Sequence, residues 1–262
     1  MADTLARDTN DTRAAVHTEP YPRRVRGYVG HTLIVDSTRA LMLFEDGHLA
    51  VWYFPPDDVH REHLVESDKH TQCPVKGTAS YWDVRVDDRV VPNAVWSYPT
   101  PIDGREDIAG LFAFYFNKLD TWYEEDDEIF VHPRSPYHRV DVLNSSRHVR
   151  IEIDGVTIAD TTRPRLLFET GLTTRYYIPR ADVRMDLLET SDTHTQCPYK
   201  GIASYYSAQV GDRLHEDIVW TYPFPIPECP KVEGLLAFWN ERVDLYVDGE
   251  LQERPESPRR RG

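Results

Sequence analysis

Two nearly identical stretches hold the residues whose types and spacing are best suited to chemistry. They read HTQCPVKGTASY over residues 70–81 and HTQCPYKGIASY over residues 194–205. Ten of the twelve positions are identical, and the copies lie 124 residues apart (194 − 70 = 124). A cysteine with a lysine and a histidine nearby can lose its proton near neutral pH and act as a nucleophile.

The cysteine of each stretch has two interpretations. Cys73 and Cys197 are candidate nucleophiles, but most free cysteines are small buried hydrophobic residues. Each precedes a proline, Pro74 or Pro198, which lacks a backbone N–H and interrupts regular strand pairing. We therefore expect each cysteine at a bulge or a turn.

The lysine of each stretch is the second catalytic candidate. If the chain is extended from Lys76, this lysine shares one strand face with Trp82 and Val84, which are apolar and belong in a core. This parity predicts that Lys76, and likewise Lys200, points inward beside a ligand pocket, because a buried lysine needs a partner or a cavity. The alternative is a lysine whose ammonium group reaches solvent at the start of the strand.

The histidine of each stretch, His70 or His194, is a candidate ligand-binding residue or general base, and equally a turn residue. One histidine and one cysteine per stretch are too few to hold a metal ion unless Asp68 or Asp192 joins them. We therefore expect neither a metal site nor a cofactor.

Further candidate ligand-binding residues lie outside the two stretches. Arg39 and Arg163 recur together with Glu45 and Glu169, and such an arginine either forms a structural ion pair or binds a carboxylate or phosphate. Two aromatic pairs share a strand face and either line a pocket or belong to a core. These pairs are Trp96 with Tyr98 and Trp220 with Tyr222.

The elements that position these residues are themselves duplicated. The offset of 124 residues holds without a gap over most of each half; for example, Leu43-Phe44-Glu45 aligns with Leu167-Phe168-Glu169, and Ala113-Phe114 with Ala237-Phe238. The chain is therefore a tandem duplication of a module of ordinary domain size. We expect a disordered tail over 1–21, a first module over 22–128, a linker over 129–145, a second module over 146–251 and a disordered tail over 252–262.

Each module is predicted to be mostly β. Short apolar, β-branched segments separated by turns, such as HTLIVDS, ALMLFE and LAVWYF, indicate about six or seven strands in a small barrel or sandwich of the β-tent kind. A segment opened by proline, PPDDVHREHLVES in the first module and PRADVRMDLLETS in the second, favours one short helix.

The composition limits the class of protein. The chain has 262 residues, is 40% hydrophobic and 28% charged, and is globular by composition. A net charge of −14 disfavours nucleic acid and anionic membranes as partners, whereas a small anionic ligand needs only one or two local cations. No apolar run reaches the roughly 18–20 residues of a membrane span. Three cysteines without a CxxC pair, and no secretory signal, favour a cytoplasmic location.

The motifs T-x-C-P-x-K-G-x-A-x-Y, W-x-Y-P-x-P and G-L-x-A-F occur in both modules. Their combination resembles the family called domain of unknown function 427, which is sometimes labelled nucleotidyltransferase-like. The resemblance covers nearly the whole chain outside the tails and linker, and it implies a compact β-rich fold. It marks as family-pattern positions Thr71, Cys73, Lys76, Gly77, Tyr81, Trp96 and Tyr98, with their equivalents in the second module. Among these, the candidate ligand contacts are Thr71, Tyr81, Trp96 and Tyr98, with Thr195, Tyr205, Trp220 and Tyr222 as their equivalents.

The residues do not favour nucleotidyl transfer. Metal-dependent nucleotidyl transfer needs paired carboxylates that hold Mg²⁺. The acidic pair Asp87-Asp88 becomes Gly211-Asp212 in the second module, so no such pair recurs. The first module also departs from the family pattern at GYVGHTLIVD and WYFPPDDV, which argues against equal activity of the two copies.

Three hypotheses about function follow. Each module holds a small-molecule pocket in which the cysteine, lysine and tyrosine assist a reaction; or it binds a ligand without turnover; or the motif only stabilises the fold. We also expect the two modules to pair within one chain with pseudo-twofold symmetry, because the linker is short.

Overall fold

The computed structural model describes residues 16–256. The chain divides into two compact units, and the boundary between them in the sequence lies between Pro133 and Arg134. They are the first and the second module. Residues 1–15 and 257–262 of the predicted tails lie outside the described range.

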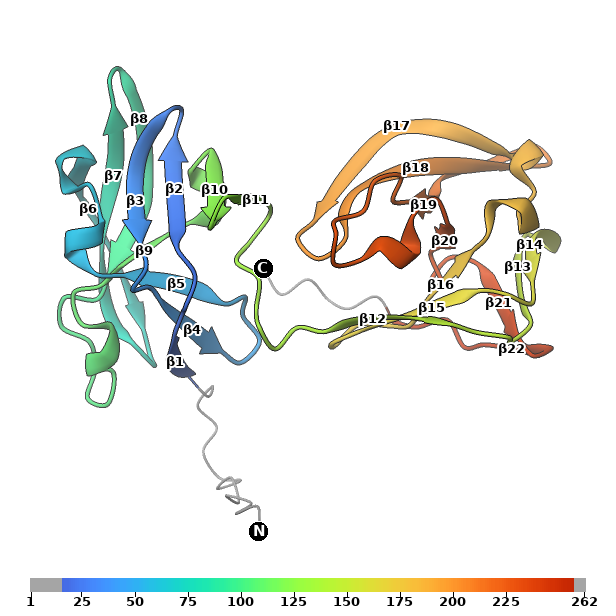
Figure 1. Ribbon diagram of the computed structural model, residues 1–262, viewed down its shortest axis with the longest axis horizontal. Helices are drawn as coiled ribbons and strands as arrows, with labels where there is room; N and C mark the ends of the chain where they lie inside the picture. Colours follow the sequence, from blue (N-terminus) through green and yellow to red (C-terminus); the bar gives the residue numbers. More distant parts are fainter. Residues whose placement is uncertain (1–15, 257–262) are drawn as a thin grey trace, which may run out of the picture. The chain divides into compact units, whose positions relative to one another are not determined.

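The first module contains a large and a small antiparallel sheet (Figure 1). The large sheet has seven strands, in the order β1 (Val16–Pro20), β4 (Leu41–Glu45), β5 (Val51–Phe54), β9 (Phe112–Phe114), β8 (Arg89–Ser97), β7 (Gly77–Val86) and β6 (Leu64–Cys73). The small sheet has four, in the order β11 (Asp127–Ile129), β10 (Thr121–Glu124), β2 (Val25–Val29) and β3 (Thr32–Ser37).

The second module repeats this arrangement. Its large sheet has the order β12 (Val140–Asn144), β15 (Arg165–Glu169), β16 (Arg175–Ile178), β20 (Leu236–Phe238), β19 (Arg213–Thr221), β18 (Gly201–Val210) and β17 (Leu188–Cys197). Its small sheet has the order β14 (Val156–Thr161), β13 (Val149–Ile153), β21 (Asp244–Val247) and β22 (Glu250–Leu251). Figure 1 shows β17 and β18 as long curved strands.

The offset of 124 residues holds for the strands as it does for the sequence. Strand β4 maps onto β15 (165 − 41 = 124) and β7 onto β18 (201 − 77 = 124). The last hairpin is the exception, with an offset of 123 residues: β10 begins at Thr121 and β21 at Asp244 (244 − 121 = 123). The prediction of two homologous, mostly β modules is confirmed.

Several details differ from the expectation. Each described module has eleven strands (7 + 4), more than the six or seven expected. Many of them are only three to five residues long, and such short strands leave little periodicity in the sequence. Strand β1 lies in the predicted tail and β12 in the predicted linker; both are sheet edges, where a clear apolar alternation is not required. The predicted short helix is a pair of 3-10 turns, Pro56–Asp58 and Arg61–His63 in the first module, and Arg180–Asp182 and Met185–Leu187 in the second.

Each large sheet is covered on both faces. One face packs on the small sheet and forms the main core, which in the first module includes Phe54, Val84 and Val95. The opposite face carries a second buried cluster that includes Tyr53, Tyr81 and Tyr98. Residues of the repeated motifs lie on this second face, among them Tyr81 and Tyr98.

Candidate functional site

A row of directly paired residues crosses the second face of the large sheet. In the first module it runs Leu41, Tyr53, Ala113, Trp96 and Tyr81, from β4 to β7. Directly paired residues of an antiparallel sheet project to the same side. The small Ala113 leaves room for the Trp96 Nε1–H to donate to the Tyr53 hydroxyl across it, at 3.2 Å.

The second module builds the same row from Arg165, Tyr177, Ala237, Trp220 and Tyr205. Its Trp220 Nε1–H donates to the Tyr177 hydroxyl, also at 3.2 Å. We call the four aromatic side chains on this side of the sheet the aromatic face. They are Tyr53, Tyr81, Trp96 and Tyr98 in the first module, and Tyr177, Tyr205, Trp220 and Tyr222 in the second.

Polar atoms of the repeated stretch meet the aromatic face. The hydroxyls of Thr71 and Tyr81 are hydrogen-bonded at 2.8 Å, and those of Thr195 and Tyr205 at 2.9 Å. Burial raises the pKa of the Tyr98 hydroxyl far above its ordinary value, and a hydrogen bond with Cys73 adds to the shift. The structure thus brings these predicted residues of the two motifs together.

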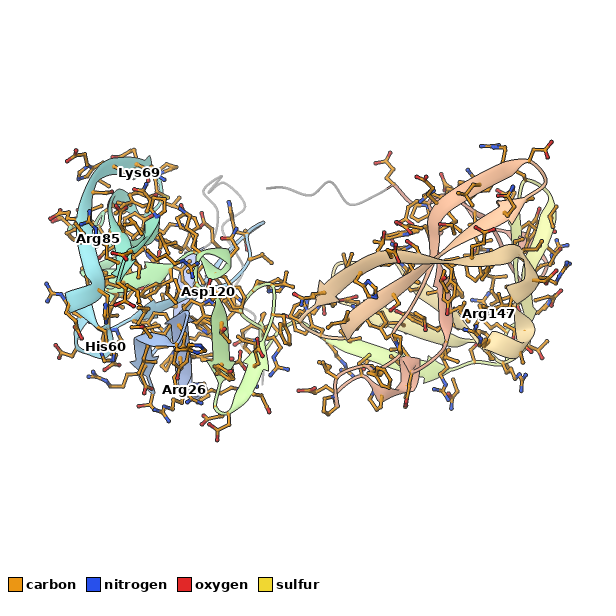
Figure 2. All side chains as sticks on the ribbon, turned by 90° about the horizontal axis from the view of Figure 1, so that it is seen from above. Arg26, His60, Lys69, Arg85, Asp120 and Arg147 are labelled. Carbon is orange, nitrogen blue, oxygen red and sulfur yellow. The ribbon has the colours of Figure 1, made fainter. Side chains whose placement is uncertain are left out.

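Access to the aromatic face is limited to its margin. Tyr81 and Tyr98 are buried, while Trp96 is half-buried. The ammonium group of Lys69, which Figure 2 labels, lies 4.2 Å from the centroid of the Tyr81 ring.

The loop after the W-x-Y-P-x-P motif covers the aromatic face. In the first module Pro101 bridges to Gly77, the Ile102 N–H donates to the Lys76 carbonyl at 3.2 Å, and Ile108 is fully buried. In the second module the Ile226 N–H donates to the Lys200 carbonyl at 3.1 Å. The motif prolines therefore start a covering loop that is hydrogen-bonded to the tip of the motif hairpin.

The parity argument for Lys76 was wrong, although the lysine is buried. Trp82 and Val84 pack in the core between the sheets, as predicted. Gly77, however, has φ +106°, and Lys76 lies in the turn that follows Cys73. The chain is not extended through this turn, so the alternation cannot be continued back to the lysine.

Each motif lysine forms an ion pair with a glutamate at the end of a distant strand. Lys76 Nζ donates to Glu45 Oε2, and Lys200 Nζ donates to Glu169 Oε2 at 2.6 Å. The lysines are only 9% and 8% exposed. Strands β4 and β7 are separated in the sheet by β5, β9 and β8. The lysine–glutamate pair therefore joins the tip of the β6–β7 hairpin to a strand with which the hairpin makes no ladder.

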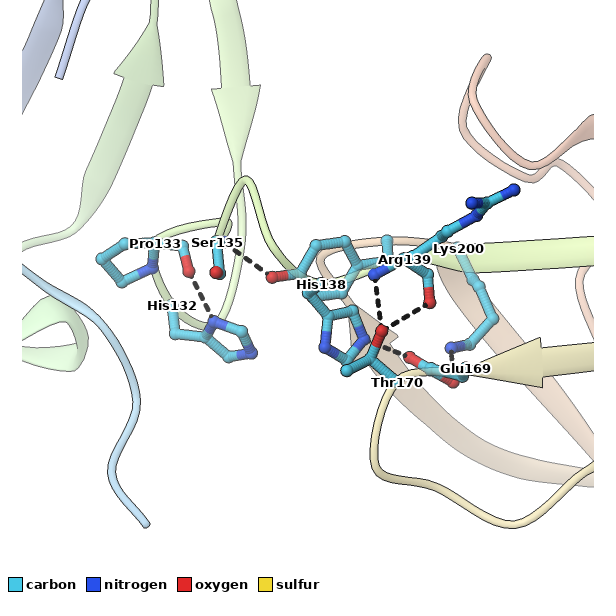
Figure 3. Close-up of polar contacts among 9 residues, drawn as sticks. His132, Pro133, Ser135, His138, Arg139, Glu169, Thr170 and Lys200 are labelled. Atoms are coloured by element: carbon cyan, nitrogen blue, oxygen red, sulfur yellow. Dashed lines mark hydrogen bonds and ion pairs between the residues drawn. The ribbon is translucent and has the colours of Figure 1, made fainter. Parts of the chain in front are cut away.

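The second module adds a histidine to this pair (Figure 3). His138 Nε2 lies 3.0 Å from Glu169 Oε1, and its ring stacks on Tyr199 with centroids 4.2 Å apart. Burial alone would raise the pKa of the Glu169 carboxyl, but Lys200 and His138 outweigh it and hold this pKa below its ordinary value. In the first module His48 Nδ1 lies 3.9 Å from Glu45 Oε1 and is mostly exposed.

The predicted arginines do not pair with these glutamates. Arg39 binds Asp58 through two nitrogens, and Arg163 binds Asp182 in the same way at 2.9 and 3.0 Å. Arg163 also lines a surface groove of about 350 Å³ together with Arg165 and Leu235. Both arginines are thus satisfied by carboxylates of the chain itself.

The predicted histidines lie away from the aromatic face. His70 and His194 are exposed, and each ring Nδ1 contacts the backbone carbonyl two residues earlier, at 3.1 and 2.9 Å. Neither histidine is a turn residue: they lie in β6 and β17, paired with Ser80 and Ser204 directly after an irregularity in the strand pairing.

The three cysteines differ in exposure. Cys73 and Cys197 are half-buried, whereas Cys229 is 3% exposed and its burial raises the pKa of its thiol to about 11. We expect iodoacetamide at pH 8 to alkylate Cys73 and Cys197 in the folded protein and Cys229 only after unfolding, because the thiolate reacts. Peptide mapping by mass spectrometry measures this. Equal labelling of all three cysteines in the folded protein would contradict it.

The described residues contain neither a metal-binding cluster nor a membrane-spanning helix. Across residues 16–256 no group of three or more histidine, cysteine, aspartate or glutamate side chains is arranged to hold a metal ion. In the same range no helix is long and apolar enough to span a bilayer.

Sequence reasoning missed three parts of this site. It grouped Glu45 with Arg39 rather than with Lys76, and it gave no role to Tyr53 or to His138. The signal for Tyr53 was present, since this residue recurs as Tyr177. No local signal joined Glu45 to Lys76, which lie 31 residues apart in sequence.

Comparison with known proteins agrees with the duplication. A family model described as domain of unknown function (DUF427) matches twice, over residues 17–125 and 141–249. The two matches lie one in each structural unit. No curated protein matches the chain.

Proposed function

The chain belongs to the DUF427 family as a tandem pair of its domains, and from this premise we propose that each module binds a small organic molecule at the margin of its aromatic face. The observation that carries the proposal is the meeting of hydroxyl, thiol and indole groups on one largely apolar surface, in both modules. Sites for small molecules combine apolar walls with a few placed polar groups.

The lysine–glutamate pair favours binding over lysine chemistry. A catalytic lysine attacks a carbonyl group with a free amine, whereas Lys200 Nζ already donates a hydrogen bond to Glu169. The pair keeps the tip of the motif hairpin beside the aromatic face. Its role in this proposal is to hold the shape of the site. Pairing of the modules within the chain stays a prediction. The anionic ligand expected from the sequence is not favoured, because each predicted cation binds a carboxylate of the chain itself: Arg39, Arg163, Lys76 and Lys200.

A reaction that depends on the motif cysteine is the second candidate. It is favoured by one observation: Cys73 and Cys197 are half-buried at the same place in both modules, each near a tyrosine hydroxyl. The Cys73→Ser/Cys197→Ser variant separates the two candidates. Binding that survives this change supports a site without turnover, and conversion of a bound compound that stops with it supports thiol chemistry.

A metabolite screen by thermal shift tests the binding proposal. We expect a compound to raise the Tm of the full chain, and the Tyr98→Phe/Tyr222→Phe variant to bind it about tenfold more weakly, because each change removes one hydroxyl and leaves the ring. Tyr28→Phe, on the small sheet, is the matched control and is expected to bind normally. Unchanged affinity of the double variant for every compound found would overturn the proposal.

A further inference from the structure

The two modules differ at the margin of the aromatic face where Trp96 and Trp220 lie. In the second module the guanidinium of Arg175 lies 5.6 Å from the centroid of the Trp220 ring and 5.2 Å from that of Trp239. Glu241 accepts two hydrogen bonds from it, at 2.8 and 2.7 Å. The second module thus places a cation of its own chain against two indole rings.

The first module keeps the ring pair and lacks this cation. The centroids of Trp96 and Tyr115 lie 4.6 Å apart at 47°, against 4.7 Å and 48° for Trp220 and Trp239. Val51 stands at the position of Arg175 (51 + 124 = 175), and Asn117 at that of Glu241 (117 + 124 = 241). The geometry of a two-ring cation site is therefore preserved where the chain supplies no arginine.

The ring pair of the first module is also more accessible. Tyr115 is 37% exposed and Trp96 is half-buried, whereas Trp220 is only 6% exposed. Lys118 Nζ lies 5.4 Å from the centroid of Tyr115 and is held by the carbonyl oxygens of Pro92 and Asn93. Within residues 16–256 no cationic group lies over the Trp96 ring.

We propose that the Trp96–Tyr115 pair of the first module binds the cationic group of a small ligand, of the guanidinium or methylated ammonium class, and that Arg175 occupies the equivalent place in the second module. The inference rests on the proposed function and assigns the first module as the one that takes a cationic ligand at this margin. Aromatic faces attract such cations. The net charge of −14 raises the local concentration of a cationic ligand.

Titration of the full chain with methylguanidinium tests the proposal, and methylurea, which is neutral and of nearly the same shape, is the matched probe. At constant ionic strength, the indole ¹H–¹⁵N resonance of Trp96 is expected to shift with methylguanidinium, and with methylurea at least tenfold more weakly. The Val51→Arg/Asn117→Glu variant, which copies the second module, is expected to lose the response. An equal response to both probes, or a response retained by this variant, would overturn the proposal.

The reverse change in the second module is expected to produce a gain of response, which misfolding of a variant cannot explain. Arg175→Val/Glu241→Asn removes the internal cation, and the Trp220 indole resonance is then expected to respond to methylguanidinium. No gain of response in a variant with native chemical shifts elsewhere would also count against the proposal.

The two proposals fail separately. If metabolites bind through Tyr98 and Tyr222 but methylguanidinium does not displace them and does not shift the Trp96 resonance, the proposed function holds and this inference fails. If no metabolite binds, but methylguanidinium shifts the Trp96 resonance equally in the parent and in the Tyr98→Phe/Tyr222→Phe variant, this inference holds and the proposed function fails.

Discussion

Replacing Lys76 with methionine is expected to lower the free energy of unfolding of the first module by about 3–5 kcal/mol, which is the usual cost of leaving a buried charge without its partner. Lys76 is 9% exposed and donates to Glu45, whose side chain is 12% exposed. Removing the ammonium group leaves the buried Glu45 carboxylate, at the end of β4, without its partner. Urea unfolding of the full chain, followed by hydrogen exchange of peptides from each module, measures the loss.

A double variant tests whether the unpaired Glu45 carboxylate causes this loss of stability. Lys76→Met/Glu45→Leu removes both charges and is expected to recover most of the stability, because apolar residues can replace a buried ion pair at little cost. Lys200→Met is expected to cost less than Lys76→Met, since His138 still lies 3.0 Å from Glu169. A Lys76→Met protein as stable as the parent would show that water reaches Glu45, and would contradict its burial.

Replacing Gly77 with alanine is expected to destabilise the first module by about 2–4 kcal/mol, from backbone strain and crowding together. Gly77 has φ +106°, which side chains rarely adopt. A Cβ here would lie 3.1 Å from the Ile102 nitrogen and 3.3 Å from the Pro101 Cα, both backbone atoms of the covering loop. Thermal unfolding with the same exchange measurement reports the effect and its location.

Gly47→Ala separates the two causes. Gly47 also has positive φ, +79°, but a Cβ there meets nothing within 4 Å, so only the conformational cost of about 1–2 kcal/mol is expected. Gly201→Ala, at φ +103° and 3.3 Å from the Ile226 nitrogen, is expected to act on the second module as Gly77→Ala acts on the first. If Gly77→Ala cost no more than Gly47→Ala, the covering loop would not be packed tightly against the motif.

Predictions from the sequence succeeded where the structure is local. The repeat needs only comparison of the chain with itself, and β3, β4 and β5 follow from short apolar segments between turns. The edge strands β1 and β12 were missed, because each is only five residues long and pairs with only one neighbour in the sheet. The turn expected at Cys73-Pro74 is present, but its effect on Lys76 was not anticipated.

The sequence by itself determined that this protein is two copies of one β module, because hydrophobic alternation and identity at an offset of 124 residues are properties of neighbouring or aligned positions. Only the tertiary structure decided that Lys76 pairs with Glu45 and that Arg175 lies against both Trp220 and Trp239. Both contacts join segments that are distant in sequence. The curvature and register of a seven-stranded sheet bring them together, and these arise from the packing of all its strands at once.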